Sequence, residues 1–295
     1  MIRLVTVLLA AGLAAVPSAQ PEVSPEPPKA DEIMARVAAN QDRSEALRKE
    51  YVYKQHVRIV TRKQSRVMRE EIADYDVVPL PDGTQKQLKS LTGRYWNKGE
   101  YVDFQAMPVP ETGKTDTGLI DGLRNYQPEF KATKTDADLI HYLRNYLSND
   151  NSKDGLARSL FPLTSAQLKN YEFKLLGQEI EAGRNVYHIA FTPRGNNKEE
   201  LTWSGEAFID AEEFQPVWVF TKMSRQIPLL VRTTWFDLPG LGFNVVYKRH
   251  EDGVWFPSSF GTEFEMRVGP LFFFNRDISI AVENSGFERR HEENK

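Results

Sequence analysis

Side chains able to act as general acids, general bases or metal ligands are few and scattered along this chain. None of the five histidines shows the spacing of a metal-binding motif such as H-E-x-x-H; they are His56, His141, His188, His250 and His291. The sequence also has no G-x-S-x-G nucleophile elbow and no glycine-rich phosphate-binding loop. Catalytic groups can converge from distant strands, so a hydrolase stays as a third alternative. We nevertheless expect a protein that is not an enzyme and that has no cofactor and no metal ion.

Glu263 and Glu265 share one face of a predicted strand and could in principle act as a pair of carboxylates. Two carboxylates about 5–10 Å apart in a cleft can share general acid and base work. Both residues, however, alternate with the apolar Phe264 and Met266, which places the carboxylates on the polar face of the strand. We therefore expect solvated or salt-bridged surface residues. The same alternation places His56 and His188 on polar strand faces.

The composition excludes several classes of protein. The net charge is −3, so no basic field points to nucleic acid or to an anionic membrane surface. The chain has no cysteine, which excludes disulfides, a cysteine-ligated zinc and the lipid attachment of a bacterial lipoprotein. Hydrophobic residues make up 40% of the chain, as in a folded globular protein.

The first residues have the pattern of an export signal. Arg3 precedes an apolar run over residues 4–16 that is too short to span a bilayer, and small residues at 16–19 offer a cleavage site. We expect a signal peptide over residues 1–19, with an uncleaved membrane anchor as the alternative. A flexible Pro- and Glu-rich linker over 20–30 follows. The mature protein should be periplasmic or secreted.

Strands dominate the rest of the chain. Residues 260–268 show the clearest period of two, with Phe260, Phe264, Met266 and Val268 on one side. An amphipathic helix capped by Asp31 should come first, over residues 31–50. A second helix should open at Asp136 and a short one should cover residues 164–170. The expected strands lie at 51–61, 66–78, 87–96, 100–105, 171–175, 187–191, 203–210, 216–223, 231–236, 243–249, 255–257, 260–268 and 276–282, and residues 107–118 should form a loop.

Regularly spaced antiparallel strands predict a sandwich or a barrel-like sheet whose edges are curled, paired or covered. No change in composition marks a linker between the strands and the interrupting helices. We therefore predict a mainly β (α+β) fold in one domain over residues 31–288, followed by a frayed tail over 289–295.

The segments Trp203–Asp210, 216–221 and 253–257 are similar to strands of the periplasmic lipoprotein-carrier (LolA/LolB-like) family, whose proteins take part in outer-membrane lipoprotein sorting. The order of elements in the mature chain also resembles that family. The resemblance implies an incompletely closed antiparallel β-barrel with covering helices, whose concave face holds acyl chains. This chain carries extra material between residues 107 and 167.

Large apolar side chains supply most of the contact area in a lipid site, and the same side chains also fill ordinary cores. The hypothetical cavity lining consists of Tyr53, Val57, Trp96, Leu143, Trp203, Trp235, Phe264 and Met266. The helix around residues 139–147 is the candidate lid. The apolar run Leu271 to Phe274 is expected in the core, with an exposed tip as the alternative.

The leading hypothesis is a binding protein for a hydrophobic ligand: an acyl chain, a lipid or a lipidated protein. The alternative is a cell-envelope module without a ligand, whose core is filled and whose partner is another envelope protein that docks on an edge strand.

Overall fold

The computed structural model describes residues 28–80, 83–106, 132–147, 163–195, 203–223, 236–268 and 273–290. The predicted signal peptide, the predicted loop over 107–118 and most of the predicted strand over 231–236 lie outside these residues. Among the described residues, no helix combines the length and the apolar character needed to cross a membrane.

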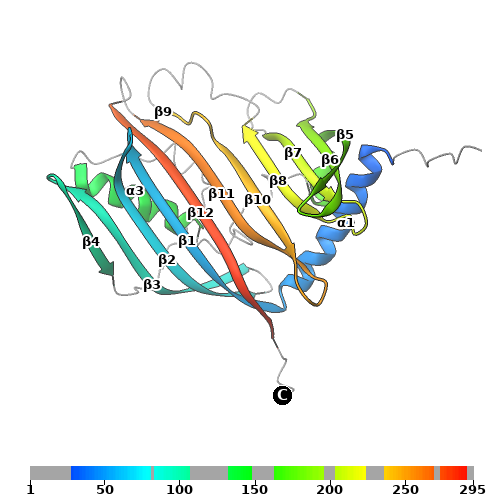
Figure 1. Ribbon diagram of the computed structural model, residues 1–295, viewed down its shortest axis with the longest axis horizontal. Coiled ribbons are helices and arrows are strands. Elements are labelled where there is room, and N and C mark those ends of the chain that lie inside the picture. Colours follow the sequence, from blue (N-terminus) through cyan, green and yellow to red (C-terminus); the bar gives the residue numbers. More distant parts are fainter. Residues whose placement is uncertain are drawn as a thin grey trace, which may run out of the picture.

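The described strands form one antiparallel sheet that stays open (Figure 1). They are β1 (Tyr51–Lys63), β2 (Arg66–Leu80), β3 (Gly83–Asn97), β4 (Glu100–Ala106), β5 (Tyr171–Glu181), β6 (Arg184–Pro193), β7 (Trp203–Asp210), β8 (Pro216–Met223), β9 (Phe236–Asp237), β10 (Gly242–Arg249), β11 (Trp255–Val268) and β12 (Phe274–Arg289). Their order is β4-β3-β2-β1-β12-β11-β10-β8-β7-β6-β5, with β9 paired to β11. The predicted half-barrel fold is confirmed.

The pairing of β1 with β12 joins the two halves of the chain. Tyr51 lies opposite Arg289 at one end of this ladder, and Arg62 lies opposite Asp277 at the other. The strands β1–β4 form a meander on one side of this seam. The strands β5–β8 form a second meander, which β10 and β11 connect to β12. Folding must therefore bring the two ends of the chain together.

Period-two alternation gives the sheet one apolar and one polar face. In β1, Tyr53, Val57 and Ile59 are buried, whereas Lys54, His56 and Arg58 are exposed. The polar Gln55 lies on the apolar side, where its amide donates to Asn284 over 2.9 Å and accepts from Lys86 over 3.0 Å. These bonds satisfy a buried amide that would otherwise destabilise the fold.

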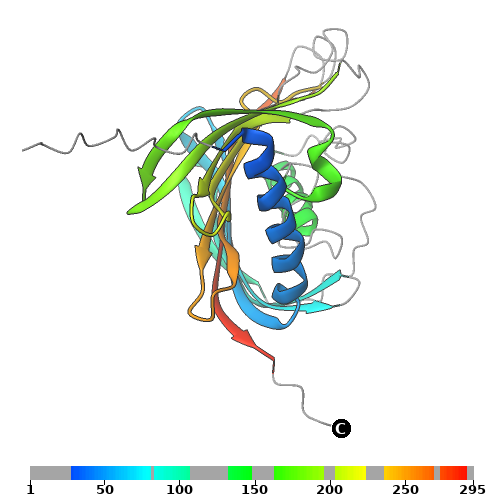
Figure 2. The ribbon, with the colours of Figure 1, turned by 90° about the vertical axis from the view of Figure 1, so that its right-hand side faces the viewer.

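Helix α1 (Ala30–Arg48) lies on the concave side of the curved sheet (Figure 2). Its buried side chains include Ile33, Met34 and Val37. Asn40 donates to the carbonyl oxygens of Glu213 and Phe214 over 2.8 and 3.1 Å. The helix is thereby fixed to the turn between β7 and β8.

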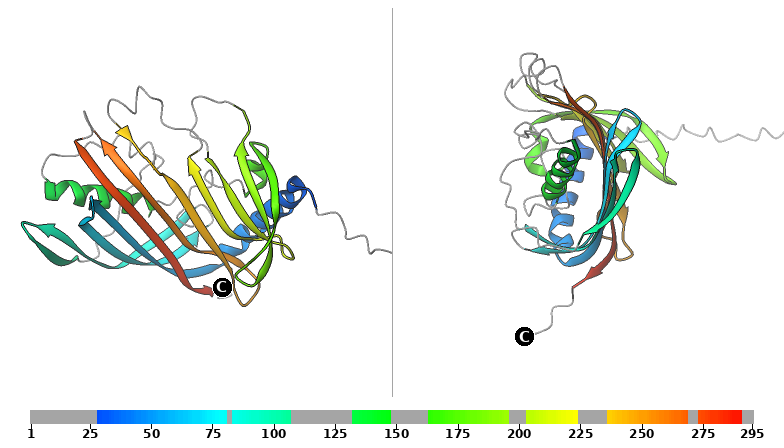
Figure 3. Two further views of the ribbon diagram at one scale, coloured as in Figure 1. Left: turned by 45° about the horizontal axis from the view of Figure 1, so that its top comes forward. Right: turned by 90° about the vertical axis from the view of Figure 1, so that its left-hand side faces the viewer.

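Helix α3 (Ala132–Leu147) lies on the same concave side, over β1, β2 and β3 (Figure 3). Leu139, Ile140 and Leu143 have no exposed surface and form one apolar stripe that faces the sheet. A short helix α4 (Ser165–Leu168) contacts α1 and β5. The expected covering helices are therefore present on the concave face.

The structure corrects several boundaries, and strands β5, β6 and β12 are longer than predicted. Asp31 lies inside the first turn of α1, and Lys29 occupies the N-cap position without a side-chain cap. Helix α3 begins at Ala132 and not at Asp136. The expected strands at 255–257 and 260–268 are one strand, β11, because a register shift between Val246 and Tyr247 of β10 accommodates the irregular residues between them.

Candidate ligand-binding face

The concave face carries a continuous apolar surface across β10, β11 and β12. Phe260 pairs with Val245 on one side and with Val282 on the other, and Phe264 pairs with Ile278. No member of this concave set is more than 8% exposed; the set consists of Phe243, Val245, Phe260, Phe264, Met266, Val268, Phe274, Ile278, Ile280 and Val282.

Helices α1 and α3 lie on the two sides of this concave set. Helix α3 contacts β1, β2 and β3, whereas α1 contacts β5 and α4 (Figure 1). Each helix also reaches these strands: Arg48 of α1 donates to the carbonyl oxygen of Trp255 in β11, and Asp136 of α3 accepts from Arg276 in β12.

Six of the predicted lining residues belong to one buried cluster. Tyr53 and Val57 come from β1, Leu143 from α3, Trp203 from β7, and Phe264 and Met266 from β11. The ring of Trp203 packs edge to face on Phe243 at 5.2 Å between centroids. The structure therefore brings these six together on the concave side.

Trp96 lies elsewhere. It is half-buried near the end of β3, where its ring packs against Tyr101 at 5.0 Å and against the guanidinium of Arg66 at 4.7 Å. Trp96 and Leu91 are an odd number of positions apart in β3, so their side chains lie on opposite faces of the sheet, and Leu91 lies in the core cluster. Trp235 lies outside the described residues. The role of the predicted lining set in ligand binding stays a prediction.

Two buried ion pairs attach α3 to the sheet. At one end, Asp136 accepts from Arg276 of β12 through both carboxylate oxygens, over 2.7 and 2.8 Å. At the other end, Arg144 donates to Glu71 of β2, which also accepts from Arg69 over 2.8 Å. The sequence predicts neither pair, because nothing in the spacing of these five residues relates the helix to the strands.

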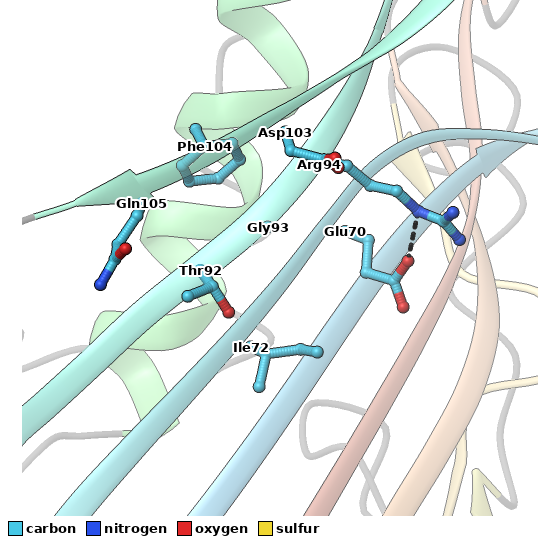
Figure 4. Close-up of a pocket in the computed structure, with 8 residues that line it drawn as sticks. All are labelled: Glu70, Ile72, Thr92, Gly93, Arg94, Asp103, Phe104 and Gln105. Atoms are coloured by element: carbon cyan, nitrogen blue, oxygen red, sulfur yellow. Dashed lines mark hydrogen bonds and ion pairs between the residues drawn. The ribbon is translucent and has the colours of Figure 1, made fainter.

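A pocket of about 580 Å³ lies over β2, β3 and β4 (Figure 4). Its lining includes Glu70, Ile72, Thr92 and Arg94, which lie on the face of β2 and β3 opposite Glu71 and Leu91. Arg94 donates to Glu70 over 2.8 Å. Burial acts to raise the pKa of Glu70, but hydrogen bonds and charge from Arg58 and Arg94 lower it overall. The lining surface is mainly apolar, but the pocket lies on the face of the sheet opposite α3 and is therefore not the predicted acyl site on the concave face.

The candidate acid–base residues form ordinary surface interactions. Glu265 accepts from Arg267 and Asn275, and Glu263 accepts from the Ser279 hydroxyl, as expected for a polar strand face. His188 is more enclosed than predicted, because Glu179 and Glu206 each lie 2.8 Å from one of its ring nitrogens. Within the described ranges, no group of three or more His, Cys, Asp or Glu side chains could hold a metal ion.

Two buried polar sites perturb pKa values without forming a cleft. Burial and a hydrogen bond to Asp252 raise the pKa of Tyr51 to about 12. Burial acts to raise the pKa of Asp210, but hydrogen bonds from the Glu213 and Glu212 amides and from Arg184 hold it below its usual value. Both sites lie in or beside turns, and their contacts explain them as structural.

Solved structures found as similar to the half-barrel include a putative lipoprotein-sorting protein domain and a LolA superfamily protein. No family model and no curated protein matches the chain. A putative outer membrane lipoprotein-sorting protein domain from Vibrio parahaemolyticus is 11% identical, with a TM-score of 0.38 and coverage of 90% of this chain and 95% of that chain. A DUF1329 family protein from Desulfovibrio piger is 10% identical, with a TM-score of 0.40 and the same coverage. A LolA superfamily protein from Nitrosomonas europaea is 9% identical, with a TM-score of 0.33 and again the same coverage. The predicted resemblance to lipoprotein-carrier proteins is thus found among solved structures.

Proposed function

We propose that this protein is a periplasmic or secreted carrier that holds a hydrophobic ligand on the concave face of its half-barrel. The ligand is an acyl chain, free or as part of a lipid or a lipidated protein. The single observation that carries this proposal is the apolar set of β10–β12 on the concave side of the open sheet.

Burial of hydrocarbon is the driving force. Each methylene group transferred from water to this surface contributes about 0.8 kcal/mol, before the cost of immobilising the ligand. Aromatic rings at Phe243, Phe260 and Phe264 supply broad contact area at a low cost in side-chain entropy. The protein needs no catalytic group for this function, and binding and release are the whole of its chemistry.

Helix α3 is the element that we expect to move. Leu139, Ile140 and Leu143 attach it to the sheet through one apolar stripe, and one ion pair holds each end. Displacing it exposes the β1–β3 side of the concave face without breaking any strand ladder. A ligand that enters beside the helix therefore competes with the contacts of the helix and not with the contacts of the sheet.

One observation favours a second function. The concave side chains are buried against each other, with Phe243 stacked on Phe260 at 5.5 Å, as in a filled core. On the opposite face, Phe208, Trp218 and Phe220 form an aromatic row, and Phe220 is 36% exposed. In this alternative the protein binds no lipid and docks on another envelope protein.

Native mass spectrometry of the protein purified from its own envelope tests the proposal. A bound lipid at a ratio of one per chain, released by organic extraction, supports the carrier and identifies the class of ligand. A protein that carries no lipid and takes up neither phospholipid nor lipopeptide contradicts it and favours the docking module. Uptake by a heat-denatured sample serves as the control for non-specific adsorption.

A further inference from the structure

Arg276 is a buried cation in the row of apolar side chains that β12 presents to the concave face. Its side chain is 8% exposed, and its neighbours in the row, Phe274 and Ile278, are both buried. The guanidinium also lies over the Phe274 ring at 4.7 Å. A charge in such a place is stable only while it is paired.

Asp136 of α3 provides that pairing. Its two carboxylate oxygens accept from Nε and Nη2 of Arg276, while Nη1 donates to the Asn275 carbonyl over 2.8 Å. This is the fork geometry that arginine offers to carboxylate and phosphate groups. In the described part of the chain, Asp136 is the one acid that pairs with Arg276.

The two ends of α3 differ in what their detachment leaves behind. If the end at Arg144 moves away, Glu71 keeps its 2.6 Å ion pair with Arg69, and both of these residues belong to the sheet. If the end at Asp136 moves away, Arg276 loses its carboxylate partner, and no other acid of the described residues pairs with it. A replacement anion therefore favours opening at this end.

We propose that Arg276 is the receptor for an anionic head group and that Asp136 occupies its place when no ligand is bound. The preferred ligand is then an acyl chain that ends in a carboxylate or a phosphate. This inference rests on the proposed carrier function and names the class of its ligand. The hydrocarbon lies along β11 and β12, and the head group takes the two hydrogen bonds that Asp136 gives up.

The ligand must compete with the helix for Arg276, and only an anion can do so. A neutral chain of equal length buries the same hydrocarbon, but it leaves either Asp136 in place or Arg276 unpaired. The structure therefore predicts discrimination by the head group and coupling between head-group binding and release of the start of α3.

Binding of matched ligands to the lipid-stripped protein tests the inference. Isothermal titration with hexadecanoic acid, hexadecyl phosphate and hexadecanol should show at least about tenfold tighter binding of the anions, which is about 1.4 kcal/mol. Comparison of hexadecanoic acid with hexadecyl phosphate identifies whether the Arg276 guanidinium prefers a carboxylate or a phosphate. Equal binding of acid and alcohol would overturn the role of Arg276 and leave the carrier function intact. No binding of any of the three would instead count against the carrier function.

Variants locate the effect. Arg276→Met should reduce the preference for the acid over the alcohol to less than about threefold, and Asp136→Asn should strengthen acid binding several-fold by weakening the internal competitor. The double variant Asp136→Leu/Arg276→Met replaces the ion pair by apolar groups, a change that proteins often tolerate, so it tests the preference if Arg276→Met does not fold. Arg144→Met is the matched control, since it loosens the other end of the helix and should keep the preference. Preference retained without Arg276, or lost equally in Arg144→Met, would refute the assignment.

Discussion

Leu143 tests whether α3 opens independently of the sheet. Its side chain is fully buried in the stripe that attaches the helix to β1–β3. Replacing a buried leucine by alanine costs about 3 kcal/mol from lost burial and the cavity that remains. If that cost falls on the helix alone, the equilibrium between attached and detached α3 shifts by about a hundredfold.

Hydrogen exchange measured peptide by peptide is the assay. In Leu143→Ala, amides of α3 should exchange about a hundred times faster, while those of β10–β12 keep their wild-type rates. The matched control is Val245→Ala, a change at a fully buried residue of β10, which should speed exchange throughout the sheet. Substitution by aspartate, Leu143→Asp, should disturb ligand retention or folding outright.

The prediction for Leu143→Ala is wrong if α3 unfolds only together with the sheet. In that case Leu143→Ala lowers the denaturation midpoint of the whole protein as Val245→Ala does, and exchange rises equally in α3 and in the strands. Such a result would remove α3 as the moving element and would leave the concave face without an entrance at this helix.

Three further outcomes follow from buried contacts. The folded protein lowers the pKa of Asp210, so the carboxylate stabilises the fold above the ordinary pKa of 3.8, and this stabilisation is lost as the pH falls through the lower folded pKa. Asp210→Asn should lower the free energy of unfolding in urea by about 2 kcal/mol at pH 7 and should flatten the acid limb of the profile of stability against pH. An unchanged acid limb would contradict this. The Tyr51 hydroxyl should titrate near pH 12 in an ultraviolet titration. The protonated hydroxyl stabilises the fold fully below pH 10, and this stabilisation declines as the pH rises toward 12. Tyr51→Phe should remove the titration step near pH 12 and no other step. Gly205→Ala should destabilise the fold strongly because its Cβ would lie 1.9 Å from a carbonyl oxygen of β8, whereas Gly177→Ala, with open space around it, should be nearly neutral by thermal unfolding; equal melting temperatures would refute the packing argument.

Period-two alternation was sufficient to predict most strands. Tyr53, Val57 and Ile59 alternate with charged residues, and that pattern determines which face is buried in any antiparallel sheet. The open barrel-like form with covering helices was also predicted. The last strand was predicted from Arg276, Ile278 and Ile280 on one face, and β12 contains all three there.

The candidate site could be predicted only in part. Burial selects Leu143 and Met266 correctly as inward residues, but alternation alone does not show that Trp96 occupies the other face of its strand, because its neighbours are mixed in polarity. The pairing of Asp136 with Arg276 joins residues 140 positions apart in the sequence. Such a contact depends on how a helix crosses a sheet, and no local periodicity encodes that angle.

Photocrosslinking tests the central claim, which is that an acyl chain lies on the concave face. The protein would be loaded with a fatty acid that carries a diazirine in its chain, irradiated and digested, and the labelled residues located by mass spectrometry. The account predicts label on inward residues of β11 and β12 such as Phe264, Met266 and Ile278, with competition by unlabelled fatty acid. Label confined to the outward row of Phe208, Trp218 and Phe220, or no label that unlabelled fatty acid removes, would contradict it.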